Sequence, residues 1–185
     1  PIHFGVNFSV AGGITRVAPT TPTRNTSVVL EVITSKNAAC EFAFNGSFKY
    51  FSQTSGTEHR ERVDNLAEGA RSYPVRCKFV SPATTRDGSI SFVVDRKAPI
   101  VRSVNDGLVS CSLSKVGLSI VADDNETSIV EYGYELFAKS AASALAVGKI
   151  TSNKPKVDDL NLTEGGEYFF KVTATDAAGN TGLAV

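Results

Sequence analysis

The 185-residue sequence has no tryptophan, no methionine and only two histidines, His3 and His59. Its three cysteines form no C-x-x-C pair, so the usual ligand sets of a structural zinc site are missing. The short motifs of P-loops, dinucleotide sites, zinc proteases and nucleophile-elbow hydrolases are also missing. We therefore expect no catalytic residues, no cofactor and no metal, and we do not expect an enzyme.

Net charge is lacking as well, because 19 basic residues balance 19 acidic ones. This balance gives no electrostatic reason to expect a nucleic-acid partner or an anionic membrane. No apolar run is long enough to cross a bilayer, so we expect no membrane span. Hydrophobic residues nevertheless make up 42% of the chain, which favours packed cores over disorder.

The sequence is rich in short segments that alternate apolar and polar residues between Gly, Asn, Asp, Pro and Ser. This pattern predicts an all-β sandwich or barrel. Only residues 137–149 show mild helical periodicity, and we interpret them as a loop or a single turn. Strands are predicted at 14–19, 27–34, 40–45, 47–52, 58–66, 71–80 and 88–95, then at 100–104, 116–124, 128–137, 145–152, 156–162, 166–176 and in the closing TGLAV.

The two halves of the chain share a local signature. LAEGARSYPVRC, from Leu66, and LTEGGEYFFKV, from Leu162, both carry L-x-E-G, then a tyrosine, then alternation. In a β-sandwich this is the corner before strand F, where the tyrosine hydroxyl caps the preceding loop. We therefore expect two diverged copies of one domain, at 14–98 and 99–185, with a short linker at RKAP (96–99).

Cys40 and Cys77 each lie in phase with apolar neighbours, so both side chains are expected to point into one core. We interpret them as a disulfide, which implies an oxidising compartment. Two buried thiols are the alternative. Cys111 is left over, and we expect it to be a buried thiol.

The N-x-[ST] sequon occurs more often than the Ser and Thr content predicts. This excess supports N-linked glycans on an extracellular or cell-surface protein. The five asparagines are Asn7, Asn25, Asn45, Asn125 and Asn161.

Few polar residues suggest site chemistry. Carboxylate and amide oxygens suit Ca²⁺, but their spacing here matches no EF-hand loop, and turn formation explains them equally well. The residues concerned are Asp123, Asp124, Asn125, Glu126, Asp176 and Asn180. His59 lies between Glu58 and Arg60 and is expected to be solvated, as is His3.

Aromatic residues are the other candidates for ligand contact. Tyr50 and Phe51 are adjacent, so one ring is expected to point outward, as a carbohydrate platform requires. Packing remains the favoured interpretation for these two residues and for Tyr132 and Tyr134.

At the level of whole motifs, LTEGGEYFFKVTATDAAGNTG resembles strands E to G of fibronectin type III and of bacterial or archaeal immunoglobulin-like surface domains. CEFAFNG, Y-x-V-R-C and ISFVVD-x-x-AP are similar to related repeats found in tandem on prokaryotic envelope proteins. The resemblance covers residues 14–185. It implies two tandem immunoglobulin-like β-sandwiches at a cell surface. It specifies function poorly, because such domains act as spacers, adhesins, enzyme accessories and filament subunits.

The N-terminal PIHFGVNFSV alternates strictly, like a half-buried strand. Domain 1 is expected to be complete without it, so residues 1–13 are interpreted as a spare strand followed by an AGG tether. Domain 2, in contrast, has only TGLAV for its final strand and is expected to lack a full G strand. The spare strand would present Ile2, Phe4, Val6, Phe8 and Val10.

A missing G strand would open the edge of strand F and a groove beside it. The predicted groove residues are Tyr168, Phe170, Val172 and Ala174. We therefore predict that the N-terminal strand inserts into domain 2 of the next copy, which makes a head-to-tail homopolymer. Such an arrangement is similar to prokaryotic pili built from donor-strand subunits, and it implies an extracellular filament subunit.

Other interpretations stand beside this one. Residues 2–10 are alternatively the first strand of domain 1, and a natural G strand alternatively lies beyond residue 185. The alternative function is an adhesin or spacer of a cell-surface protein, which binds a ligand as a monomer.

Overall fold

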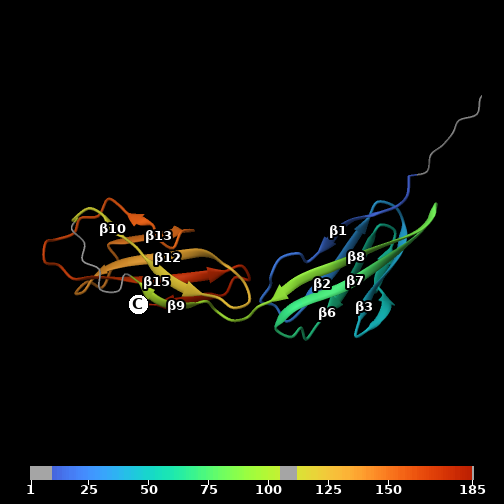
Figure 1. The fold of residues 1–185 in the computed structure, drawn as a ribbon, viewed down its shortest axis with the longest axis horizontal. Helices are drawn as coiled ribbons and strands as arrows, with labels where there is room; N and C mark the ends of the chain where they lie inside the picture. Colours follow the sequence, from blue (N-terminus) through green and yellow to red (C-terminus); the bar gives the residue numbers. More distant parts are fainter. Residues whose placement is uncertain (1–9, 105–111, 185) are drawn as a thin grey trace, which may run out of the picture. The chain divides into compact units, whose positions relative to one another are not determined.

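The computed structural model describes residues 10–104 and 112–184, which form strands and turns without a helix (Figure 1). In this part of the chain, therefore, no helix is available to cross a membrane. The chain divides into two compact units between Val94 and Asp95. Residues 95–98, which the sequence assigns to the end of the first domain, group with the second unit. The expected donor residues Ile2, Phe4, Val6 and Phe8, as well as His3, Asn7 and Cys111, lie outside the described residues.

Unit 1 is a sandwich of two four-stranded antiparallel sheets. The first sheet has the order β1 (Ile14–Ala18), β2 (Val28–Thr34), β6 (Glu58–Val63), β5 (Gln53–Ser55). The second has the order β4 (Ser47–Tyr50), β3 (Ala38–Phe44), β7 (Gly69–Val80), β8 (Ala83–Val94). The inner faces form one core that includes Leu30, Val32, Phe42, Phe51, Val75, Ile90, Phe92 and Val94.

Unit 2 has one four-stranded sheet and two facing strand pairs. The sheet has the order β13 (Ala146–Ile150), β12 (Ile129–Ala138), β15 (Tyr168–Asp176), β16 (Thr181–Ala184). The pairs are β9 (Ile100–Val104) with β11 (Ile120–Asp123), and β10 (Val116–Gly117) with β14 (Lys156–Val157). The core includes Leu118, Ile120, Leu136, Phe170, Val172 and Ala174. Two tandem β-sandwiches are therefore the fold, as the alternation predicts.

The predicted disulfide is confirmed. Cys40 and Cys77 are bonded, and their Cα atoms lie 4.1 Å apart. They are register partners on the neighbouring strands β3 and β7, and both are fully buried. The bridge thus joins two strands of one sheet rather than the two sheets, and it fits an oxidising compartment.

The two tyrosine corners differ. The backbone N–H of Thr163 donates to the hydroxyl oxygen of Tyr168 over 2.8 Å, so this tyrosine caps the preceding loop as expected. Tyr73 instead packs in the core of unit 1, with its ring centroid 6.2 Å from those of Phe42 and Phe92. The shared sequence signature therefore lies at the same corner of both sandwiches. Of its two tyrosines, Tyr168 caps the preceding loop and Tyr73 packs in the core.

Residues 11–13 are not a free tether. Gly12 is buried, and a Cβ there would lie 2.1 Å from the ring of Phe79. Gly13 exchanges hydrogen bonds with Ser35, since its N–H donates to the Ser35 Oγ and its carbonyl accepts from the Ser35 N–H, each over 2.9 Å. The Lys36 ammonium also donates to the Val10 carbonyl. The chain is therefore fixed on unit 1 from Val10 onward.

Candidate functional site

The edge of β15 is only partly covered by the last strand of unit 2. β16 pairs with the stretch from Val172 to Thr175, whereas β15 begins at Tyr168. Within the described residues, no strand pairs with 168–171 on this side. The final strand has four residues, and the unpaired edge is shorter than the Tyr168–Ala174 stretch expected to line a groove. Val172 and Ala174 are fully buried opposite β16, which leaves Tyr168 and Phe170 in the open stretch.

β16 contributes small side chains to the core. Gly182 is buried and Ala184 is half-buried, whereas Leu183 between them is 64% exposed. A Cβ on Gly182 would lie only 1.9 Å from the carbonyl oxygen of Pro99, so the close backbone approach requires glycine here. The corresponding strand of unit 1, β8, instead presents large apolar residues such as Phe92 to its core.

The open stretch has an aromatic residue on each face of the sheet. Phe170 points into the core, and the neighbouring Phe169 stacks on Phe137 with centroids 5.3 Å apart and planes 12° apart. The Lys171 ammonium lies 4.6 Å from the centroid of the Phe137 ring. A strand added at this edge would therefore meet apolar surface on both faces.

Three carboxylates gather where β15 ends, and we call them the acidic cluster. Oxygens of Asp95, Asp124 and Asp176 lie within 4.8 Å of one another. Asp124 and Asp176 are among the residues that the sequence suggests for Ca²⁺, whereas Asp95, 81 positions before Asp176, is not. Asp95 and Asp176 are both buried.

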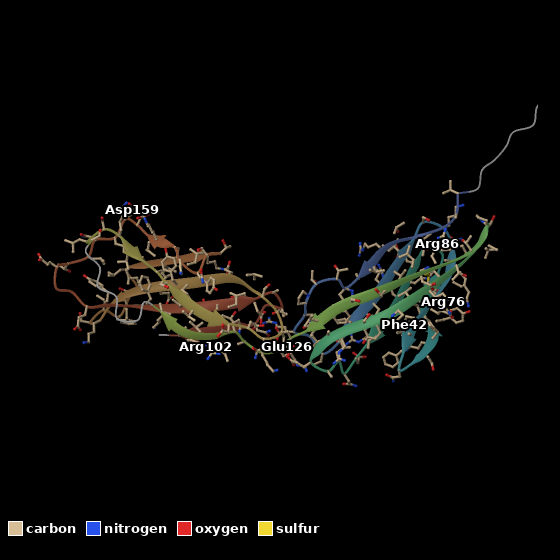
Figure 2. All side chains as sticks on the ribbon, in the orientation of Figure 1. Phe42, Arg76, Arg86, Arg102, Glu126 and Asp159 are labelled. Carbon is tan, nitrogen blue, oxygen red and sulfur yellow. A yellow bond between two sulfur atoms is a disulfide. The ribbon has the colours of Figure 1, made fainter. Side chains whose placement is uncertain are left out.

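Two other acidic residues considered for Ca²⁺ have different partners. Asp123 pairs with Arg102, and a Glu126 oxygen lies 3.8 Å from the Lys97 ammonium. Arg102 and Glu126 are labelled in Figure 2. Asn125 is exposed. The neighbouring polar residues 123–126 therefore do not converge on one site, because their side chains have different partners.

Hydrogen bonds account for the buried carboxylates. Asp176 accepts from the N–H groups of Ala178 and Asn180 over 2.8 and 2.9 Å, and from the Asn180 amide over 2.8 Å. Asp95 accepts from the Lys97 N–H over 3.0 Å and from the Thr127 hydroxyl over 2.7 Å. The same Asn180 amide donates to the Asp95 carbonyl over 2.8 Å. These hydrogen bonds thus hold the turn after β15 against the start of unit 2. The buried carboxylates have the turn-forming contacts that the sequence offers as the alternative to Ca²⁺.

The expectation of a solvated His59 is wrong. Its ring is fully buried beside Phe51, because His59 is in phase with Val63 on the inner side of β6. The Thr54 hydroxyl lies 2.8 Å from Nδ1 and the Thr34 hydroxyl 3.4 Å from Nε2. Burial lowers the pKa of this imidazole below its ordinary value.

The aromatic candidates separate as the sequence predicts. Phe51 is buried, and its neighbour Tyr50 points outward. Tyr132 is buried and Tyr134 packs against the core of unit 2. All four described sequon asparagines are exposed, and these are Asn25, Asn45, Asn125 and Asn161.

Comparisons with known proteins support the fold. No protein-family model and no curated protein matches the chain. A solved fragment of titin is 18% identical over 89% of this chain, with a TM-score of 0.58. The chain spans 57% of the length of that fragment.

Two further solved structures are similar at lower scores. The fibronectin(III)-like modules of Clostridium thermocellum CbhA are 11% identical, cover 94% of this chain and 90% of that one, and have a TM-score of 0.49. The FN1–FN3 domains of chicken CNTN1 are 17% identical, cover 92% and 66%, and have a TM-score of 0.45. Together with the strand order, the titin likeness supports the fold, which is two tandem β-sandwiches.

Proposed function

We propose that the chain is a structural subunit of an extracellular, pilus-like filament. Its N-terminal strand inserts beside β15 in unit 2 of the next copy, and the joint repeats head-to-tail. The observation that carries the proposal is the open stretch Tyr168–Lys171 beside the short strand β16. The alternating segment before Val10 is the matching strand in the sequence.

The close approach of the Pro99 carbonyl to β16 determines where the incoming strand can bind. Replacing β16 would bring a side chain against the Pro99 carbonyl, where only Gly182 fits. The donor strand therefore continues the row beyond Ala184 and pairs with Tyr168–Lys171, and β16 stays in place. Phe4, Val6 or Phe8 then lies next to Phe170 on the inner face, and His3, Gly5 and Asn7 face outward.

The root of the donor strand has a fixed position on unit 1. Val10 is 74% exposed, while its carbonyl accepts a hydrogen bond from Lys36 and the next residues pack on Phe79 and Ser35. Nine residues before this root reach about 30 Å when extended. Pairing with four residues uses about 14 Å of that length, so the remainder spans the approach between copies.

The free energies of side-chain burial and chain ordering predict a weak contact between neighbouring subunits. Two inward side chains contribute roughly 3–6 kcal/mol, at about 1.5–3 kcal/mol each. Ordering four residues costs roughly 4–8 kcal/mol, at about 1–2 kcal/mol each. Net binding therefore depends on the added free energy of backbone hydrogen bonds along the edge and of the outer contact with Phe169. Assembly is consequently expected to depend steeply on protein concentration.

The proposal includes an extracellular location, N-linked glycans and no enzymatic activity. Support comes from the Cys40–Cys77 disulfide and from the exposure of the four described sequon asparagines. Mass spectrometry of protein from its native source tests the glycans. Unmodified asparagines at all sequons would remove that part of the proposal.

Paired variants test the filament itself. Phe4→Asp with Phe8→Asp places two charges on the apolar phase, and His3→Asp with Asn7→Asp places the same charges on the polar phase. At high concentration we expect fibres from wild type and from the polar-phase control by negative-stain electron microscopy. We expect monomers from the apolar-phase variant by sedimentation velocity.

Two outcomes would contradict the proposal. One is a wild-type chain that stays monomeric at high concentration. The other is fibre formation that survives the apolar-phase variant. A monomeric chain would favour the alternative, an adhesin or spacer of a cell-surface protein.

A further inference from the structure

We propose that the outer face of the sheet β4-β3-β7-β8 in unit 1 is a binding platform for a neutral oligosaccharide, centred on Phe48 and Tyr50. The two residues lie on the edge strand β4 and are 41% and 56% exposed. Lys49 between them points the other way, with its ammonium 5.0 Å from the Phe42 ring centroid and 4.8 Å from that of Phe44. Since side chains alternate along a strand, Phe48 and Tyr50 share one face.

These two rings do not fill the core. Phe42 and Phe51 occupy the interior beside β4, and neither Phe48 nor Tyr50 is among the residues packed there. Over half of Tyr50 and part of Phe48 are exposed, so both residues can present aromatic surface to a ligand. The negative π face of such a ring attracts the slightly positive C–H groups of a pyranose ring, in a dispersion contact.

A row of fixed polar groups runs across the sheet from Tyr50. The register places Glu41 opposite Tyr50, then Arg76 opposite Glu41, then Asp87 opposite Arg76. Arg76 Nε donates to the Asp87 carboxylate over 3.1 Å, and its Nη1 lies 3.8 Å from Glu41. The Lys78 ammonium lies 3.3 Å from the same Glu41 oxygen.

Arg76 connects the polar row to the aromatic pair. Its Cζ lies 4.6 Å from the centroid of the Phe48 ring (Arg76 is labelled in Figure 2). A guanidinium has five N–H groups, and the contacts to Asp87 and Glu41 engage only some of them. The side chain is thus held in place and still has donors for hydroxyl oxygens of a ligand.

The charges of the platform select the ligand class. Arg76 and Lys78 carry two positive charges, and Glu41 and Asp87 carry two negative charges, so they cancel. An anionic nucleic acid, whose affinity comes from cationic contacts to phosphate, would meet two carboxylates here. A neutral oligosaccharide combines apolar C–H faces with hydroxyls that donate and accept, and it matches both parts of this surface.

Affinity electrophoresis of the full chain tests the platform. The gels contain soluble neutral polysaccharides, namely hydroxyethylcellulose, xylan, mannan and laminarin, or the anionic polymers polygalacturonate and polyuridylate. We expect retardation by at least one neutral polymer. Tyr50→Ala and Phe48→Ala should each weaken binding by at least about tenfold, because each removes one stacked ring.

Matched variants separate a binding role from a structural one. Tyr50→Phe keeps the ring and should retain binding. Leu183→Ala removes an exposed apolar side chain from unit 2 and should have no effect. Circular dichroism melts should be unchanged in all four variants. Failure of every neutral polymer to retard the protein, retardation by anionic polymers alone, or undiminished binding by Tyr50→Ala would each overturn the proposal.

Discussion

His59 is buried in unit 1 with a threonine hydroxyl on each ring nitrogen. The Thr34 hydroxyl donates to the Lys36 carbonyl over 2.8 Å, so it can only accept from the imidazole. Nε2 therefore carries the proton, and Nδ1 accepts from Thr54. Protonating Nδ1 would place a charge in the core and break the bond from Thr54, which agrees with the lowered pKa of this ring.

The titration of His59 predicts the pH dependence of unit 1. Because burial lowers the folded-state pKa below the unfolded value of about 6.5, the unfolded chain binds more protons in that range. The free energy of unfolding therefore falls as the pH drops through about 6.5 toward the folded pKa. Thermal melts by circular dichroism between about pH 8 and 5.5 should show this decline. His59→Gln should flatten it, and an equally steep decline in that variant would contradict the explanation.

The periodicity that predicts the cysteines gives only a weak signal for the histidine. Cys40 and Cys77 lie among apolar residues, so their inward phase is evident from the sequence. His59 has charged neighbours, Glu58 and Arg60, which belong to the outer face of β6. Val63, four positions on in the same phase, is buried, but the charged Glu61 between them shares this phase and is half-buried. Neighbouring charges say little about a strand residue, because adjacent side chains point to opposite faces.

At the scale of elements, β16 depends on one glycine. Gly182→Ala would bring a Cβ against the Pro99 carbonyl oxygen, so strand and linker would have to separate. We expect unit 2 to lose about 1–3 kcal/mol of unfolding free energy, as measured by urea denaturation. Gly117→Ala is the control, since its Cβ would meet no atom within 4 Å. Equal effects of the two substitutions would show that the approach of Pro99 does not constrain β16.

Strand patterns in the sequence predict burial better than they predict pairing. Leu160 and Leu162 are buried as their alternation indicates, but they lie outside β14, and their N–H groups donate to Ser114 and Leu113. Conversely, 83–87 has no apolar alternation and still forms the first part of β8. Backbone pairing with β7 holds this segment, and such pairing does not need buried side chains.

At the scale of the whole molecule, the boundary between the units is sharp in sequence. Val94 is buried in the core of unit 1, and the next residue, Asp95, is buried in the acidic cluster of unit 2. A fragment of residues 95–185 should therefore be more stable than one of residues 99–185. The shorter fragment loses the hydrogen bonds of Asp95 with the half-buried Thr127 and Asn180, at about 0.5–3 kcal/mol for each bond.

Chemical denaturation of the isolated fragments measures this difference. A third fragment, 94–185, is the control, because Val94 belongs to the other core and should add nothing. Equal stability of fragments 95–185 and 99–185 would place Asp95 outside the cooperative unit.

The tandem organisation is the part of the architecture most evident in the sequence, because L-x-E-G and the following tyrosine recur in both halves. The acidic cluster could not be predicted in full. It depends on Asp95 meeting Asn180, 85 positions apart in the chain. Local patterns carry no information about such a contact, which exists only once the sandwich has folded.

The disulfide has a mechanical consequence. Cys40 and Cys77 close a loop that spans 37 positions. If the chain were pulled from its ends until unit 1 unravelled, the loop would stay shut and withhold about 130 Å of contour length. Single-molecule stretching should show a correspondingly longer release step once a reductant is added. How far this molecule extends under load is therefore set by the redox state of its surroundings as well as by the strength of its fold.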